Sequence, residues 1–292
     1  MPYWALYLQS EHFSPVEIGI LMSIFQISRI FAPNFWGWLA DHTAKRTVWI
    51  RLNTVLGVLG FIAVFWAEGF WSMLLVMGAL SLFTSSTMPL SESLTLAHLA
   101  NTKGHYSRIR MWGSVGFIVA SIFLGYLIDF AGISSLLWAI LVVQITLFLL
   151  TFTLTEANVA PHHTDHFSVW NILRNPAVVA LLIGCALMVS AHGVLYNFYS
   201  IYLAAHGYSK GMIGWLWSLG VICEIVVFML MPIIMRRFSL KAIILVSLAL
   251  AVIRFAMTGL AVDYLVLLLI AQSLHAATFG SFHAATVEVV AK

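Results

Sequence analysis

Charged residues are scarce in this sequence. Of its 292 residues only 9% are Asp, Glu, Lys or Arg, whereas 62% are hydrophobic and the mean hydropathy is +0.98. A soluble domain typically has roughly 45–50% apolar and about 25% charged residues. The composition therefore excludes an ordinary soluble domain and predicts a protein that crosses a membrane several times.

Cysteines and enzyme motifs are scarce as well. The two cysteines, Cys185 and Cys223, each stand alone inside an apolar run, where a thiol behaves as a small hydrophobic group. We therefore expect no disulfide framework and no metal site. The sequence also lacks a phosphate-binding glycine loop, a nucleophile constellation and the basic blocks that indicate nucleic-acid binding. We expect neither an enzyme nor a cofactor nor a nucleic-acid partner.

The apolar residues gather in segments long enough to be membrane helices. A helix rises about 1.5 Å per residue, so about 20 apolar residues span the hydrocarbon layer of a bilayer. Such segments occur at about 15–40, 48–67, 70–97, 110–130, 134–155, 176–204, 211–235, 241–261 and 264–290. A shorter segment at 1–9 carries interfacial aromatic residues, so we expect Met1 to lie inside a first helix.

Positive charges alternate between successive loops. Eleven of the fourteen Lys and Arg residues lie at 41–51, 98–110, 156–175, 236–241 and 292, one is Lys210, and two, Arg29 and Arg254, lie inside apolar segments. Basic loops of membrane proteins stay on the cytoplasmic side. We therefore expect the loops at 41–51, 98–110, 156–175 and 236–241 to be cytoplasmic. The opposite loops, at 10–15, 67–70, 129–134, 205–210 and 261–264, contain Lys210 as their only basic residue, and we expect them to be extracellular.

A short motif follows the second segment. It reads Gly37-Trp38-Leu39-Ala40-Asp41-His42-Thr43-Ala44-Lys45-Arg46. This stretch resembles the signature between the second and third helices of the major facilitator superfamily of transporters, although His42 and Ala44 depart from that pattern. The resemblance implies a gating role for Gly37, Asp41, Lys45 and Arg46. A basic loop that only sets the topology is the alternative.

The resemblance also implies a fold of two six-helix bundles, of which this chain has part of helix 1, helices 2–10 and no helices 11–12. The longest polar interval divides the chain into an N-terminal bundle at 1–156, a cytoplasmic linker at 157–175 and a C-terminal bundle at 176–292. His162, His163, Asp165 and His166 in this linker are metal-ligand types, but we expect a solvated linker. The family further implies a bacterial inner (plasma) membrane, and we expect a monomer.

An internal repeat relates the two halves. A shift of 195 positions (202 − 7) places Tyr7-Leu8 on Tyr202-Leu203, Ser14 on Ser209 and Ile18-Gly19 on Ile213-Gly214. The same shift places Arg29 on Glu224. In transporters with parallel repeats the substrate site lies near the bilayer midplane, between the repeats.

Ionisable residues inside membrane helices are costly and usually functional. Arg29 and Glu224 are therefore our first candidates for substrate binding or proton coupling; a structural ion pair, or two unrelated partners, is the alternative. Glu92 follows Pro89, which can bend its helix and expose polar groups. A hydrated carboxylate at the membrane interface explains Glu92 equally well.

The last apolar segment carries two histidines on one helical face. His275, Phe279 and His283 recur every four residues. Imidazole titrates near neutral pH, which suits a proton relay, and the aromatic neighbours suit an aromatic substrate. Histidines that are hydrogen-bonded within the bundle are the alternative. His192 is a weaker candidate.

The stretches at 110–117 and 274–283 resemble the branch of the superfamily that contains bacterial phenylpropionate permeases, which is related to lactose and nucleoside proton symporters. The branch implies proton-coupled symport of a small organic solute, such as an aromatic acid, by alternating access. A carboxylate would suit Arg29 or Arg254. A sugar or nucleoside would suit the side-chain amides of Gln26, Asn34, Asn53, Asn197 and Gln272. A truncated or non-transporting protein that needs the missing helices is a further alternative.

Overall fold

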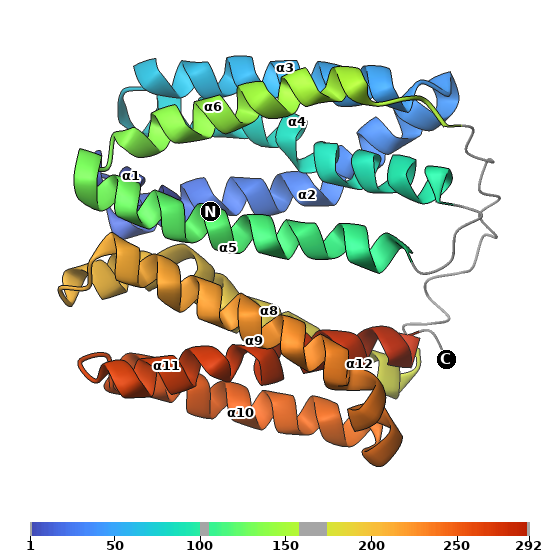
Figure 1. Cartoon of the computed structure of the whole chain (residues 1–292), viewed down its shortest axis with the longest axis vertical. Coiled ribbons are helices and arrows are strands. Elements are labelled where there is room, and N and C mark those ends of the chain that lie inside the picture. The colour runs from blue at the N-terminus through green and yellow to red at the C-terminus, as the bar shows by residue number, and fades with distance from the viewer. Residues whose placement is uncertain (1, 100–104, 158–173, 291–292) are drawn as a thin grey trace. The chain divides into compact units, whose positions relative to one another are not determined.

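The computed structural model describes residues 2–99, 105–157 and 174–290. Met1 and the linker histidines lie outside these residues. Within them the chain is helical and contains no strand (Figure 1). The helices are α1 (Trp4–Ser10), α2 (Pro15–Thr43), α3 (Arg46–Ile62) with η1 (Ala63–Trp66), α4 (Gly69–His98), α5 (His105–Ala131), α6 (Ser135–Leu150) with η2 (Thr151–Thr153), α8 (Pro176–Ala205), α9 (Lys210–Arg237), α10 (Leu240–Leu260), α11 (Leu265–Ser273), the π-helical turn η3 (Ala276–Gly280) and α12 (Ser281–Val290).

Nine of the described helical stretches are long and apolar enough to span a membrane. They match the nine apolar segments of the sequence, so the predicted all-α membrane fold is confirmed. Their large apolar side chains face outward, as with Phe130 at 92% and Leu260 at 88% exposure. Such exposure suits a lipid environment, because hydrocarbon chains replace water around these side chains.

The turns after α1 and α8 share one backbone conformation. His12 and Gly207, which are 195 positions apart, both have positive φ angles of 64° and 83°. In each turn the next N–H group donates to the carbonyl oxygen five residues earlier, at 3.3 and 3.1 Å. Ser14 and Ser209 then cap α2 and α9, and each Oγ accepts the N–H three residues later, at 3.3 and 3.2 Å. The predicted repeat is therefore present in the backbone.

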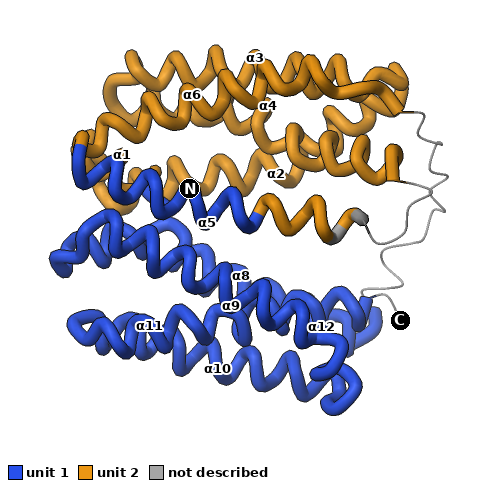
Figure 2. The backbone as a smooth tube through the Cα atoms, in the orientation of Figure 1, with its two compact units in different colours: residues 1–3, 114–130, 165–292 blue, residues 4–113, 131–164 orange. Residues whose placement is uncertain are grey.

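The chain forms two compact units, which Figure 2 colours differently. Unit 1 contains residues 1–3, 114–130 and 165–292, and unit 2 contains residues 4–113 and 131–164. Most of α5 thus belongs with the C-terminal helices. The division at 157–175 that the sequence suggests remains a prediction.

Small polar contacts join the helices inside each unit. In unit 2 the hydroxyls of Ser28 on α2 and Ser81 on α4 lie 2.6 Å apart. In unit 1 the hydroxyls of Ser247 on α10 and Ser281 on α12 lie 3.0 Å apart. Short side chains let membrane helices approach closely, and a hydrogen bond between them satisfies groups that lipid cannot.

Candidate functional site

A fully buried arginine lies at the centre of the C-terminal helices of unit 1. Arg254 on α10 has 0% exposure, and its guanidinium lies 5.1 Å from the centre of the Phe255 ring. Its Nε donates to the carbonyl oxygen of Ala271 at 3.1 Å, and its Nη1 lies 3.4 Å from the hydroxyl of Thr278. These neutral acceptors hold the guanidinium without cancelling its charge.

His192 on α8 is the third partner of Arg254. Its Nε2 lies 3.0 Å from Nη1 of Arg254, and its Nδ1 lies 2.9 Å from the carbonyl oxygen of Met188. A guanidinium can only donate and a carbonyl can only accept. His192 therefore carries its proton on Nδ1 and presents a lone pair to the arginine.

A second histidine faces a carboxylate. Nε2 of His275 lies 3.8 Å from Oε2 of Glu224 on α9, and both side chains are largely buried. Glycines permit this approach, because a Cβ at Gly220 would lie 3.2 Å from the His275 ring and one at Gly280 would lie 3.1 Å from Cγ of Glu224. Gly280 ends the π-helical turn η3, and such turns are frequent at functional sites. We call Arg254, His192, His275, Glu224, Gln272 and Thr278 the polar cluster.

Aromatic rings border the polar cluster. The ring of Phe279 stacks on His275 with centroids 5.4 Å apart and on His283 with centroids 6.3 Å apart. The predicted common face of these three residues is therefore confirmed, and the π-helical turn does not disrupt it. The centroid of the Tyr196 ring lies 5.7 Å from that of His192 and 5.8 Å from that of Trp217. A ligand beside the cluster would meet rings as well as polar groups.

Some buried nitrogen atoms of the polar cluster lack a hydrogen-bond partner. Among the described residues, these are Nη2 of Arg254, Nε2 of Gln272 and Nδ1 of His275. The guanidinium and amide nitrogens can only donate. Buried donors are normally satisfied, so this arrangement suits a ligand that supplies acceptors.

Other predicted site residues lie in unit 2 or away from the cluster. Nη1 of Arg29 donates to Oε1 of Gln26 at 3.2 Å, and both side chains are exposed on α2. Arg29 and Glu224 belong to different units, so their proposed pairing stays a prediction. Glu92 on α4 and Asn197 on α8 are half-buried. Their functional roles also remain predictions.

One of the amides offered for a sugar already donates a hydrogen bond within unit 2. Asn53 is fully buried, and its Nδ2 donates to the hydroxyl of Ser86 at 3.0 Å. This contact joins α3 to α4, which favours a packing role for Asn53.

The gating motif forms a compact turn between α2 and α3. Nη2 of Arg46 pairs with Oδ1 of Asp41 across Ala44, whose φ is 50°. The arginine is almost buried, whereas the aspartate and Lys45 are exposed. A Cβ at Gly37 would meet no atom within 4 Å, so no neighbour in unit 2 requires glycine there.

Glu156 is a partner of this turn that the sequence reasoning missed. Its carboxylate accepts the N–H groups of Arg46 and Thr47 at 3.1 and 3.0 Å, and the Thr47 hydroxyl at 2.7 Å. Burial opposes its ionisation, but these hydrogen bonds outweigh burial and hold the pKa of the carboxyl below its usual value. Glu156 therefore caps α3, whose own N-cap residue Lys45 provides no side-chain bond. The only sequence signal was an acidic residue just after an apolar segment.

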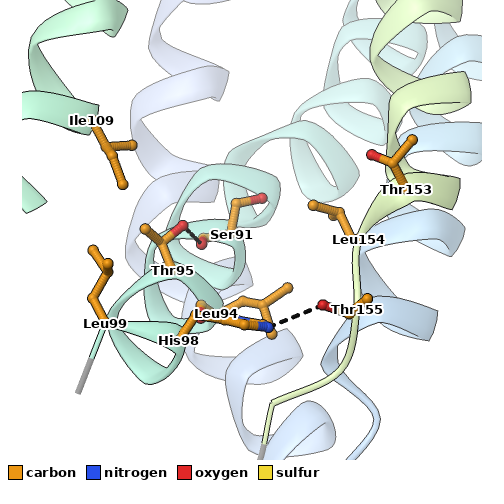
Figure 3. A pocket seen from close by; sticks show the side chains of 9 residues that line it. All are labelled: Ser91, Leu94, Thr95, His98, Leu99, Ile109, Thr153, Leu154 and Thr155. Atoms are coloured by element: carbon orange, nitrogen blue, oxygen red, sulfur yellow. Dashed lines mark hydrogen bonds between the residues drawn. The ribbon is translucent and has the colours of Figure 1, made fainter. Parts of the chain in front are cut away.

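A cavity of about 300 Å³ lies at the end of α4 (Figure 3). Nε2 of His98 lies 3.1 Å from the hydroxyl of Thr155, and Figure 3 shows this bond across the cavity. Among the described residues, the lining contains no Asp, Glu, Lys or Arg. Its residues are Ser91, Leu94, Thr95, His98, Leu99, Ile109, Thr153, Leu154 and Thr155.

Comparisons with known proteins identify relatives over the whole chain. The sequence model of the MFS_1 like family matches residues 1–292. A probable 3-phenylpropionic acid transporter of Escherichia coli (strain K12) is 29% identical over 100% of this chain and 77% of that protein. A maltose permease of Geobacillus stearothermophilus is 34% identical, over 47% of this chain and 35% of the permease.

A solved structure has the same fold. The crystal structure of the nucleoside transporter NupG (D323A mutant) superposes with a TM-score of 0.85 over 98% of this chain and 77% of that one, at 19% identity. At this identity the likeness shows the fold alone. The described helices therefore form part of the two-bundle fold that the sequence predicts.

Proposed function

Because the chain belongs to the MFS_1 like family of the major facilitator superfamily, we propose that it carries a small aromatic acid together with a proton across a bacterial inner membrane by alternating access. The protein is a multi-pass membrane transporter of a small molecule, not an enzyme. The acid, the proton and their binding residues are inferred from the polar cluster.

The buried guanidinium of Arg254 is the observation that carries this proposal. Its Nη2 has no hydrogen-bond partner among the described residues, and its contacts at Nε and Nη1 are neutral. An uncompensated charge inside a membrane protein is costly, and a carboxylate would both neutralise it and accept its free donor. The rings of Phe279 and Tyr196 beside the cluster would bind the aromatic part of the same solute.

The pair of Glu224 and His275 supplies a proton site. Carboxylate and imidazole lie 3.8 Å apart, so a proton on either group is stabilised by the other. One solute carboxylate and one proton together carry no net charge. The solute carboxylate pairs with Arg254 and the proton removes the charge of Glu224, so neither buried charge is left unpaired when the site turns to the other side of the membrane.

Residues of α2, α4 and the turn between α2 and α3 would form the rest of the solute pathway. Arg29, Gln26 and Glu92 would line the solute pathway within unit 2. Asp41, Lys45 and Arg46 would stabilise one end of the pathway when it is closed, on the cytoplasmic side to which the basic loops assign them. The protein would act as a monomer.

An uptake screen tests the proposal. The full-length protein is reconstituted into vesicles and supplied with labelled 3-phenylpropionate, maltose or uridine, with and without an inward proton gradient. We expect the gradient to drive accumulation of 3-phenylpropionate above its equilibrium level. Accumulation that is the same after the gradient is collapsed would contradict proton coupling.

Proton-coupled uptake of a sugar or nucleoside is the second candidate. It is favoured by Gln272, which is 2% exposed and whose Nε2 has no partner among the described residues. An amide donor of this kind suits hydroxyl and carbonyl oxygens as well as carboxylates. Accumulation of maltose or uridine in the same screen, without 3-phenylpropionate, would support this candidate. Failure of every solute would favour a non-transporting protein.

A further inference from the structure

Helices α5 and α9 of unit 1 touch through two glycines. A Cβ atom at Gly125 would lie 2.6 Å from the hydroxyl of Tyr3 and would overlap the carbonyl oxygen of Lys210. A Cβ atom at Gly214 would lie 2.7 Å from the same hydroxyl. Any side chain at either position would push the helices apart, so the two helices meet backbone to backbone.

Tyr3 links the two helices at this contact. Its side chain is fully buried, and its hydroxyl lies 2.8 Å from the carbonyl oxygen of Ser121 on α5 and 2.9 Å from that of Lys210 on α9. A hydroxyl has a single proton, which is therefore shared between the two carbonyl oxygens. Separation of α5 from α9 would leave the hydroxyl with only one of these acceptors.

Asp129 near the end of α5 caps the start of α9. Its Oδ1 accepts the N–H of Lys210 at 2.9 Å, and its Oδ2 accepts the N–H of Gly211 at 2.7 Å. The next N–H group, that of Met212, donates to the hydroxyl of the N-cap residue Ser209 at 3.2 Å. The first N–H groups of a helix have no partner within it and carry partial positive charge, so a carboxylate from another helix binds them well.

These contacts gather at one end of each helix. They involve residues 121–129 of α5 and residues 210–215 of α9, including a 3.2 Å hydrogen bond from Nε1 of Trp215 to the hydroxyl of Tyr126. Both segments belong to unit 1 in Figure 2. The loops beside them, at 129–134 and 205–210, are those that the charge pattern assigns to the extracellular side.

We propose that Asp129 and Tyr3 form a latch that holds α5 against α9 at the extracellular end and breaks each time the transporter opens to that side. This inference rests on the proposed function, because only a transporter that alternates between two openings needs such a contact to break.

The chemistry of the latch suits repeated opening. The carboxylate of Asp129 is exposed, so water can replace the two N–H groups when they leave it. At Gly125 and Gly214 backbone packs on backbone, so Tyr3 is the side chain that must adjust there when the helices separate. The closed state is thus held by a few directional bonds, and its population depends on them.

Spin labels can measure this opening directly. The chain offers exposed positions for them at Phe130, at the end of α5, and at His206, just after α8. The full-length protein carries cysteines at these two positions in a Cys185→Ser, Cys223→Ser background. Double electron–electron resonance then reports the distances in nanodiscs and the ratio of open to closed molecules.

Asp129→Asn is the main test variant. Its amide keeps the size of the side chain, but it removes the negative charge and aims an N–H₂ group at one of the two backbone donors. We expect the ratio of open to closed molecules to rise by about tenfold, which corresponds to about 1.4 kcal/mol. Tyr3→Phe removes only the shared hydroxyl and should raise the ratio by about fivefold.

Asp263→Asn is the matched control. Asp263 is an exposed aspartate in the loop at 261–264, which the charge pattern assigns to the same side. We expect its distance distribution to equal that of the wild type. A distribution that is unchanged in both Asp129→Asn and Tyr3→Phe, or that shifts equally in the control, overturns the latch.

Uptake measured on the same samples separates the two proposals. A shift towards the open state in protein that accumulates no tested solute supports the latch and rejects the proposed function. Normal proton-driven uptake with unshifted distances rejects the latch and leaves the proposed function standing.

Discussion

Nε2 of His192 and Nη1 of Arg254 lie 3.0 Å apart at the centre of the C-terminal helices. The arginine must donate in this contact, so the histidine accepts and is neutral. His192 therefore orients the guanidinium, and in the proposed mechanism the coupled proton binds elsewhere. The neighbouring pair of Glu224 and His275 is the group that remains for this role.

The orienting role of His192 predicts that any side chain with a suitable acceptor can replace it. We expect His192→Gln to keep uptake within about threefold of the wild type, because its amide oxygen can still accept the hydrogen bond from Arg254. His192→Leu should lose most uptake. The pH profile of uptake in His192→Gln should match that of the wild type; a displaced profile would mean that His192 itself carries the proton.

Arg254 is predicted to recognise the carboxylate of the solute. Arg254→Gln should raise KM for 3-phenylpropionate by about 10- to 100-fold, because a hydrogen bond to a charged group contributes about 1.5–3 kcal/mol. To isolate the effect of the solute's charge, the uncharged amide of the same acid is added as a competitor of uptake. We expect the amide to compete poorly in the wild type and as well as the acid in Arg254→Gln. Equal competition by both solutes in the wild type would exclude this role.

Glu224 is predicted to couple transport to the proton. Glu224→Gln cannot lose or gain a proton at this position, so we expect gradient-driven accumulation to disappear. Exchange of labelled for unlabelled solute at equal pH needs no net proton movement and should persist. Loss of both activities, with protein still inserted and folded, would instead assign Glu224 to solute binding.

Glu156 is predicted to stabilise the fold in a pH-dependent way. The pKa of its carboxyl is lowered in the folded protein, so its contribution is fully present above the usual value and is lost as the pH falls through the folded pKa. Glu156→Gln should therefore reduce the free energy of unfolding by about 1 kcal/mol at pH 7, a typical value for a helix cap. Because Glu156 is exposed, solvent screening keeps this effect small.

The difference between Glu156→Gln and the wild type should shrink as the pH falls through the folded pKa of Glu156, as measured by thermal unfolding from pH 7 downwards. Glu68→Gln is the matched control, because Glu68 precedes α4 without a side-chain cap bond. A loss of stability in Glu156→Gln that persists unchanged in acid would show that the capping carboxylate is not its source.

Much of the fold could be predicted from the sequence because lipid imposes simple rules on it. The membrane-spanning helices follow from the lengths of the apolar segments. The internal repeat follows from turn residues that match between the two halves, such as Ser14 and Ser209. The structure confirms both at the level of helices and caps. The π-helical turn at Ala276–Gly280 was not predicted. It lies where Gly280 packs against Glu224, a residue of another helix.

The residue types of the polar cluster could be predicted from the sequence, but their partners could not. Arg254, Glu224, His275 and Gln272 stand out as polar groups in apolar segments, and the structure brings them into one cluster. Their pairing could not be read from the sequence, since Arg254 and His192 are 62 positions apart. Glu156 and Asp129 were missed for the same reason, because each caps a helix that is distant in the chain.

Proton movement that accompanies solute entry is the most direct test of the central claim. Vesicles containing the full-length protein in a weakly buffered medium receive 3-phenylpropionate, and the external pH is recorded; protein-free vesicles give the passive entry of the acid for subtraction. We predict an external alkalinisation that matches the acid taken up and is absent in Glu224→Gln. Protein-dependent uptake of the acid without any such pH change would contradict the account.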